Sequence, residues 1–231
     1  MDMRAKKRLL PVFLILICGQ FLLAEDYQYQ YFKDEKKEKV PFSDYIPKVR
    51  LHYKTVPHYL EDYYELYGMK QYWDENSLRV NIEKLKAGLN SKFRHPSLAL
   101  VKIGSDEEFL KYRNLLFMHI NLLIMRNYLS IASKYDKRKI EFHNVDFAED
   151  IKKSLDVAEL YYKDALPYWE QTKNYASIAS AVKITTDLGF MESERYSIVR
   201  GELDYGKIIN NYIKDIALKK NKLDELAAVK K

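Results

Sequence analysis

The feature that most constrains this chain is the spacing of its apolar residues, which recur at intervals of three and four over most of the length. That interval matches the 3.6 residues per turn of an α-helix and places the apolar side chains on one face. The clearest stripes are Leu78, Ile82, Leu85, Leu89 and Phe93, and Ile151, Leu155, Ala158, Tyr162, Ala165 and Trp169. The spacing therefore predicts an all-α fold.

The composition agrees with a helical interpretation. Only 7 glycines and 6 prolines occur in 231 residues, which argues against sandwiches, propellers and glycine-rich nucleotide cradles. Hydrophobic residues make up 47% and charged residues 31%, enough apolar material for a sizeable core. We expect about six antiparallel helices over residues 51–231, forming either a bundle or a short tetratricopeptide-like helical array.

Local signals in the first half predict where helices begin and end. Pro57 suits a helix start and Gly68 a helix end. A second helix is expected over about 75–93, before a His-Pro pair. A capping box over 105–108 should open a third helix that ends near 134. Because the middle of that third helix is apolar on nearly all sides, we expect it to be the buried centre of the core.

The second half predicts three further helical segments. One should begin near residue 146 and either kink or stop before Pro167. A small-residue segment over 176–181 should be closed by Gly189. The last helix is expected over about 203–228, with an inward stripe of Tyr205, Ile209, Tyr212, Ile216 and Leu223.

The first 24 residues have the pattern of a secretory signal peptide. Four basic residues precede an apolar run of about 16 residues, and Ala24 stands before Glu25 and Asp26. We expect cleavage after Ala24 and export across the inner membrane to the periplasm, with an uncleaved anchor as the alternative and no further membrane span. The single cysteine lies in this leader, which suits an exported mature protein. Much of the +6 net charge also lies there, so binding to nucleic acid is not expected.

Residues 25–50 form a tyrosine-rich, charged lead-in that we expect to be partly extended. Three tyrosines alternate with glutamines where no core requires them: Tyr27, Tyr29 and Tyr31. Tyrosine combines a large apolar ring with a polar tip and is enriched at protein interfaces. We therefore expect this arm to dock on a partner protein.

A second group of aromatic candidates follows between residues 59 and 73. It consists of Tyr59, Tyr63, Tyr67, Tyr72 and Trp73. These residues are candidate partner-binding positions. Interleaved acids also allow an alternative, a module that binds a ligand or cell-wall glycan and even hydrolyses it with paired carboxylates: Glu61, Asp62, Glu65, Asp74 and Glu75.

No motif for catalysis, cofactor binding or metal binding stands in the sequence. None of the five histidines has a second histidine four residues on, and there is no nucleophile elbow, phosphate loop or dinucleotide fingerprint. His119 is the sharpest acid–base candidate, but a hydrogen-bonded core histidine explains it as well. We therefore expect a protein that is not an enzyme and that needs no cofactor.

Two stretches carry a family resemblance. Residues 158–165 have the Ala-aromatic-Ala spacing of the second helix of a tetratricopeptide repeat, with Phe142 and Val145 as its upstream half. Together with residues 185–196 and the leader, they resemble spirochaete periplasmic helical proteins, some of which are accessory parts of the flagellar motor collar or filament. The resemblance implies a structural role among envelope or flagellar proteins, as a homo- or hetero-oligomer, and no catalytic residues.

Overall fold

A computed structural model divides the chain into two units, Met1–Val56 and Pro57–Lys231, and describes residues 57–137 and 139–230. Within these residues six α-helices occur and no strand: α3 (Leu60–Tyr63), α4 (Glu75–Leu89), α5 (Asp106–Tyr135), α6 (Ala148–Ala181), α7 (Gly189–Val199) and α8 (Tyr205–Lys230). A π-helical turn (Tyr64–Gly68) continues α3, and 3₁₀ turns lie at Pro96–Leu98 and Phe142–Phe147. The predicted all-α fold with about six helices is confirmed.

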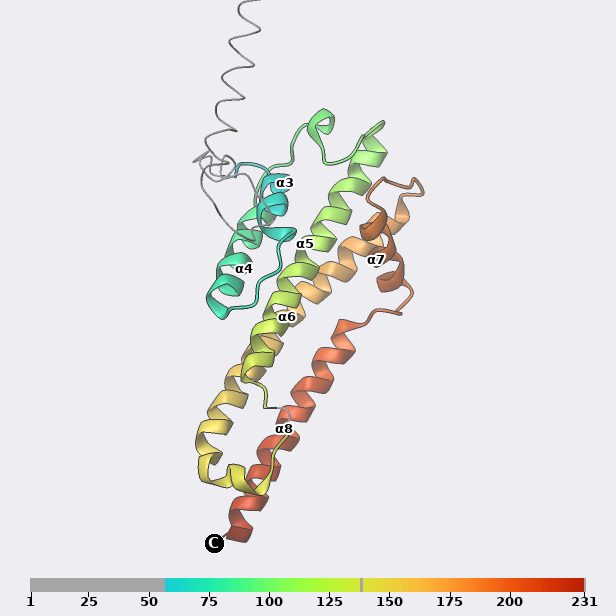
Figure 1. Ribbon diagram of the computed structural model, residues 1–231. Coiled ribbons are helices and arrows are strands. Elements are labelled where there is room, and N and C mark those ends of the chain that lie inside the picture. The colour runs from blue at the N-terminus through green and yellow to red at the C-terminus, as the bar shows by residue number, and fades with distance from the viewer. Residues whose placement is uncertain (1–56, 138, 231) are drawn as a thin grey trace, which may run out of the picture. The chain divides into compact units, whose positions relative to one another are not determined.

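The long helices α5 and α6 run antiparallel and form the centre of this unit (Figure 1). Helix α4 packs on α5, α8 packs along α6, and α7 packs against both central helices. The core lies between these elements and is rich in leucine, isoleucine and tyrosine. This packing is that of a helical bundle.

Helix α5 is the buried centre that the sequence predicts. Ser105 caps it by accepting a hydrogen bond from the Glu108 amide at 3.1 Å, while the Glu108 carboxylate accepts from the Gly104 amide at 2.7 Å. Nine of the eleven residues from 115 to 125 are buried, so apolar side chains all round the helix find partners. In the described part of the chain, α5 is also the one helix long and apolar enough to cross a membrane, but 61% of its apolar window is buried within the protein.

Helix α6 does not stop before Pro167, contrary to one of the two predicted outcomes. It runs without interruption over 34 residues from Ala148 to Ala181. Proline removes one backbone hydrogen bond and costs about 3 kcal/mol in a helix interior. Ala165 and Trp169 flank it and are fully buried, so packing on the neighbouring helices offsets that loss.

Two other predicted boundaries are wrong. Gly189 begins α7 and does not close the preceding segment, because α6 already ends at Ala181. Helix α4 ends at Leu89, before Phe93, whose ring packs on Phe117 with ring centroids 5.1 Å apart. The helix expected to begin near residue 146 is confirmed, since α6 begins at Ala148, directly after the 3₁₀ turn over Phe142–Phe147.

The inward stripe predicted for α8 is correct at three of its positions. Ile209, Ile216 and Leu223 are fully buried, and Tyr205 is partly buried. Tyr212 is 42% exposed, contrary to prediction, although its ring stacks on Tyr162 with centroids 5.0 Å apart. Because α8 packs mainly on a single neighbour, its buried face is narrow.

The residues predicted as half of a tetratricopeptide repeat lie within one long helix. Ala158, Tyr162 and Ala165 are buried on α6. Phe142 and Val145 lie on the 3₁₀ turn that leads directly into this helix, so they do not form a separate first helix packed against it. A repeat architecture therefore stays a prediction.

Candidate functional site

The predicted partner-binding residues fall into three groups. Three lie outside the described residues: Tyr27, Tyr29 and Tyr31. Three lie on or beside the first helical segment and face the bundle in part: Tyr59, Tyr63 and Tyr67. The last two, Tyr72 and Trp73, lie on the connector of residues 69–74 that joins this segment to α4.

The first helical segment uses its aromatic rings mainly for packing. The rings of Tyr63 and Tyr67 lie 6.3 Å apart, and both side chains are partly buried. Tyr63 also lies against α4, where Gly88 leaves room for it: a Cβ added at Gly88 would lie 2.8 Å from the Tyr63 Cβ. Tyr59 is 42% exposed and stands just before α3. These three tyrosines therefore do not form one exposed binding surface.

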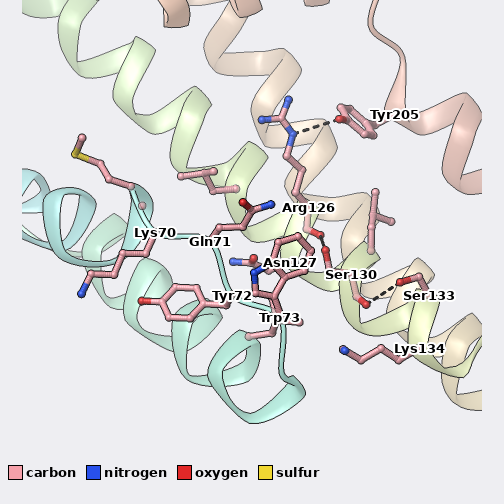
Figure 2. Close-up of a pocket in the computed structure, with 15 residues that line it drawn as sticks. Lys70, Gln71, Tyr72, Trp73, Arg126, Asn127, Ser130, Ser133, Lys134 and Tyr205 are labelled. Atoms are coloured by element: carbon pink, nitrogen blue, oxygen red, sulfur yellow. Dashed lines mark hydrogen bonds between the residues drawn. The ribbon is translucent and has the colours of Figure 1, made fainter. Parts of the chain in front are cut away.

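The connector of residues 69–74 lines a cavity of about 640 Å³, which we call the connector cavity. Figure 2 shows Tyr72 and Trp73 on one side of it and the α5 residues on the other. Tyr205, the first residue of α8, contributes a third aromatic ring. The cavity therefore combines segments that are far apart in the sequence.

The wall of the connector cavity mixes aromatic, apolar, amide, hydroxyl and cationic groups. Its side chains include four apolar ones, Met69, Leu78, Leu123 and Leu129, and four that can hydrogen-bond without charge, Gln71, Asn127, Ser130 and Ser133. Its charged residues are all cations, Lys70, Arg126 and Lys134. A volume of this size and a few polar groups among apolar ones are typical of small-ligand sites.

Arg126 connects the cavity to a buried network behind it. Its Nε donates to the Tyr205 hydroxyl at 3.2 Å, and its Nη1 donates to Glu194 Oε1 at 3.0 Å. The second oxygen of Glu194 lies 2.6 Å from His119 Nδ1. His119 is therefore a hydrogen-bonded core histidine, with its ring packed edge-on against Tyr64.

Burial and charge shift the pKa values in this network. Burial raises the pKa of the Glu194 carboxyl, but hydrogen bonds and charge from His119 and Arg126 outweigh it, so the net pKa is lowered. Burial, with the nearby charge of Glu194, raises the pKa of Tyr64 to about 12. Glu194 is thus an anion that holds the Arg126 side chain in place.

The carboxylates considered for glycan hydrolysis are not brought to the cavity wall. Asp62 and Glu65 both form ion pairs with Arg94. Glu61 is fully buried, and it accepts hydrogen bonds from the Arg94 amide at 3.0 Å and the Tyr112 hydroxyl at 3.1 Å. These three carboxylates hold the first helical segment to the chain after α4.

The remaining two acids, Asp74 and Glu75, form hydrogen bonds at the start of α4. Asp74 caps the helix by accepting from the Ser77 amide at 2.8 Å. Glu75 accepts from Arg79 and, at 2.6 Å, from the Tyr135 hydroxyl. Among residues 57–137 and 139–230, no group of three or more histidine, cysteine or acidic side chains is arranged to hold a metal ion.

Sequence reasoning found one side of the cavity and missed the other. Tyr72 and Trp73 were candidates, but Arg126, Lys134 and Tyr205 were not. One signal was present: Arg126 is the first charged residue after the apolar run in the middle of α5. Its position in the same cavity wall as Trp73 depends on how α4 and α5 pack, which periodicity does not specify.

Comparison with known proteins identifies a family. A family model described as Domain of unknown function (DUF8513) matches residues 107–226, which is more than half of the chain and covers α5 to most of α8. No curated protein and no solved structure matches the chain. With this match over its central helices, the chain belongs to the DUF8513 family.

Proposed function

We propose that this chain is an exported, non-enzymatic helical protein that binds other envelope proteins during assembly of a cell-envelope or periplasmic flagellar structure. The leader pattern in residues 1–24 supports export. The observation that carries the binding proposal is the exposure of two large apolar side chains on one short connector. Met69 is 70% exposed and Trp73 is 74% exposed.

Exposed apolar side chains are common one at a time, but a largely exposed tryptophan that lines a cavity is a typical interface anchor. Covering the exposed part of Trp73 removes on the order of 150 Å² from water, which is worth about 3 to 4 kcal/mol before the entropic cost of association. Tryptophan is also among the residues that dominate measured binding energies. Trp73 is therefore the residue on which partner binding should depend most.

The test is crosslinking and capture from the native envelope with the full chain and two variants. Trp73→Ser removes the anchor, and Leu98→Ser is the matched control because Leu98 is 66% exposed on a different turn. We expect the native chain and the control to capture the same envelope proteins, and Trp73→Ser to lose them while its circular dichroism is unchanged. Equal capture by both variants, or recovery of soluble metabolic enzymes alone, would contradict the proposal.

A second candidate function, binding of a small ligand or a cell-wall glycan, is favoured by the connector cavity itself. Trp73 stands at its rim, and neutral hydrogen-bonding groups line it behind the ring. We propose binding without hydrolysis, because the acids at positions 61, 62, 65, 74 and 75 are held by the structural contacts described above. Direct titration with sugars tests this candidate independently of protein capture.

A further inference from the structure

All charged residues that line the connector cavity are positively charged. Three cations line it, and none of the fifteen lining residues is an acid. One cation, Arg126, is paired with Glu194, which lies outside the wall. The other two, Lys70 and Lys134, form no ion pair with any residue in the described part of the chain. Figure 2 shows the Lys70 side chain directed away from the α5 side of the wall, so Lys134 is the cation that a ligand beside Trp73 would meet.

The acids next to the cavity do not neutralise Lys134. Asp74 and Glu75 follow Trp73 directly and feel the charge of Lys134. However, the Asp74 carboxylate caps α4, and Glu75 is held by Arg79 and Tyr135. Their hydrogen bonds are directed at the protein, so the Lys134 ammonium keeps its own donors for a partner.

The uncharged part of the wall is suited to a sugar ring. The exposed Trp73 ring can pack on the apolar C–H face of a pyranose, as can Tyr72 beside it, while the amides of Gln71 and Asn127 can bond its hydroxyls. Figure 2 shows Gln71 and Asn127 between the connector and α5, and these amides have no hydrogen bond to other described side chains. A cavity of about 640 Å³ accommodates one or two sugar units.

We propose that the connector cavity binds a carboxylate-bearing sugar, with the ring against Trp73 and the carboxylate near Lys134. This inference rests on the second candidate function, that the cavity is a ligand site. Charge-assisted hydrogen bonds from an ammonium to a carboxylate are stronger than neutral ones, so the acidic group should decide which sugars bind. A neutral sugar of the same shape should bind more weakly.

The test uses two pairs of sugars that differ by an acidic group: glucuronic acid against glucose, and N-acetylmuramic acid against N-acetylglucosamine. The chain has two tryptophans, of which Trp169 is 1% exposed, so a change in emission on titration reports mainly on Trp73. We expect each acidic sugar to bind at least about tenfold more tightly than its neutral counterpart, which corresponds to about 1.4 kcal/mol. Added salt should narrow this difference.

Two variants identify the groups that carry the selectivity. Lys134→Gln should weaken binding of the acidic sugars about tenfold and leave the neutral sugars unchanged. Lys84→Gln is the matched control, because Lys84 is also exposed on a helix, forms no ion pair with a described residue and lies outside the wall. Both variants should have the same melting temperature as the native chain, since neither lysine contributes to the core.

Three results would overturn the inference. The first is equal affinity for acidic and neutral sugars, which would leave the cavity as a ligand site without charge selection. The second is binding of inorganic phosphate but of no sugar. The third is no binding of any probe, which would also refute the second candidate function; a Trp73-dependent capture of envelope proteins would then still support the first.

Discussion

Replacing Lys111 by methionine should destabilise the bundle strongly. The Lys111 ammonium on α5 lies 2.9 Å from Glu192 Oε1 on α7, and it also donates to the Ile184 carbonyl oxygen in the chain before α7. The two side chains are 5% and 11% exposed, so water screens this pair very little. Lys111→Met keeps an apolar stem of similar shape and removes the charge, leaving Glu192 as a buried anion with one partner fewer.

The expected cost follows from the partners that Glu192 retains. Removing one member of a buried ion pair typically costs 3–5 kcal/mol. Glu192 keeps a hydrogen bond from Arg195 at 2.8 Å and weaker ones from Thr186, so we expect the lower end, about 3 kcal/mol. For a domain of this size, that loss lowers the melting temperature by roughly 6–12 °C.

Urea denaturation followed by circular dichroism measures the effect. Lys84→Met, at an exposed lysine without an ion pair among the described residues, is the control and should change stability by less than about 0.5 kcal/mol. Adding Glu192→Gln to Lys111→Met should recover part of the loss, because the buried Glu192 anion is then gone and the Arg195 cation that loses it is 19% exposed. A loss below about 1 kcal/mol for Lys111→Met, or a double variant as unstable as the two single losses added together, would refute the reasoning.

Two further predictions rest on single contacts, and a third rests on the leader pattern. Gly88→Ala should lower stability by about 1–3 kcal/mol in thermal melts, because its Cβ would lie 2.8 Å from that of Tyr63, whereas Gly189→Ala, with nothing within 4 Å, should cause no loss. The lowered pKa of Glu194 means that its contribution to stability is fully present above the ordinary carboxyl pKa of 4.5 and is lost as the pH falls through the lower folded-state value. Glu194→Gln should therefore flatten the fall in melting temperature below about pH 4.5, and a profile parallel to that of the native chain would contradict this. Mass spectrometry of the protein recovered from the periplasm should find a chain that begins directly after Ala24, whereas an intact leader would contradict cleavage.

The helices of this protein could be predicted because their signals are local. The spacing of Leu78, Ile82 and Leu85 marks the buried face of α4, and all three are buried. The capping box at Ser105 marks the start of α5 and is also a local signal, since its hydrogen bonds join residues three or four apart. Where a prediction failed, as at Pro167, a local rule competed with packing: α6 continues because the residues around the proline are buried against other helices.

The candidate site could be predicted only in part. The tyrosines at positions 59, 63 and 67 share composition and spacing with Tyr72 and Trp73, yet Tyr63 and Tyr67 are partly buried, Tyr59 is exposed away from the cavity wall, and only the last two line the cavity. Exposure is a property of the whole packed molecule, because a ring is buried by whichever helix lies against it. Sequence patterns therefore could not separate an anchor from a core residue.

The amino-acid sequence by itself determined the all-α class, the central position of α5 and the absence of recognisable catalytic motifs, since each depends on the order of neighbouring residues. The tertiary structure decided that Trp73, Arg126, Lys134 and Tyr205 share one cavity. These residues come from three segments spread over more than half of the chain, and they meet because α4, α5 and α8 pack in one particular arrangement. That arrangement follows from the fit of whole helix faces, which no local pattern encodes.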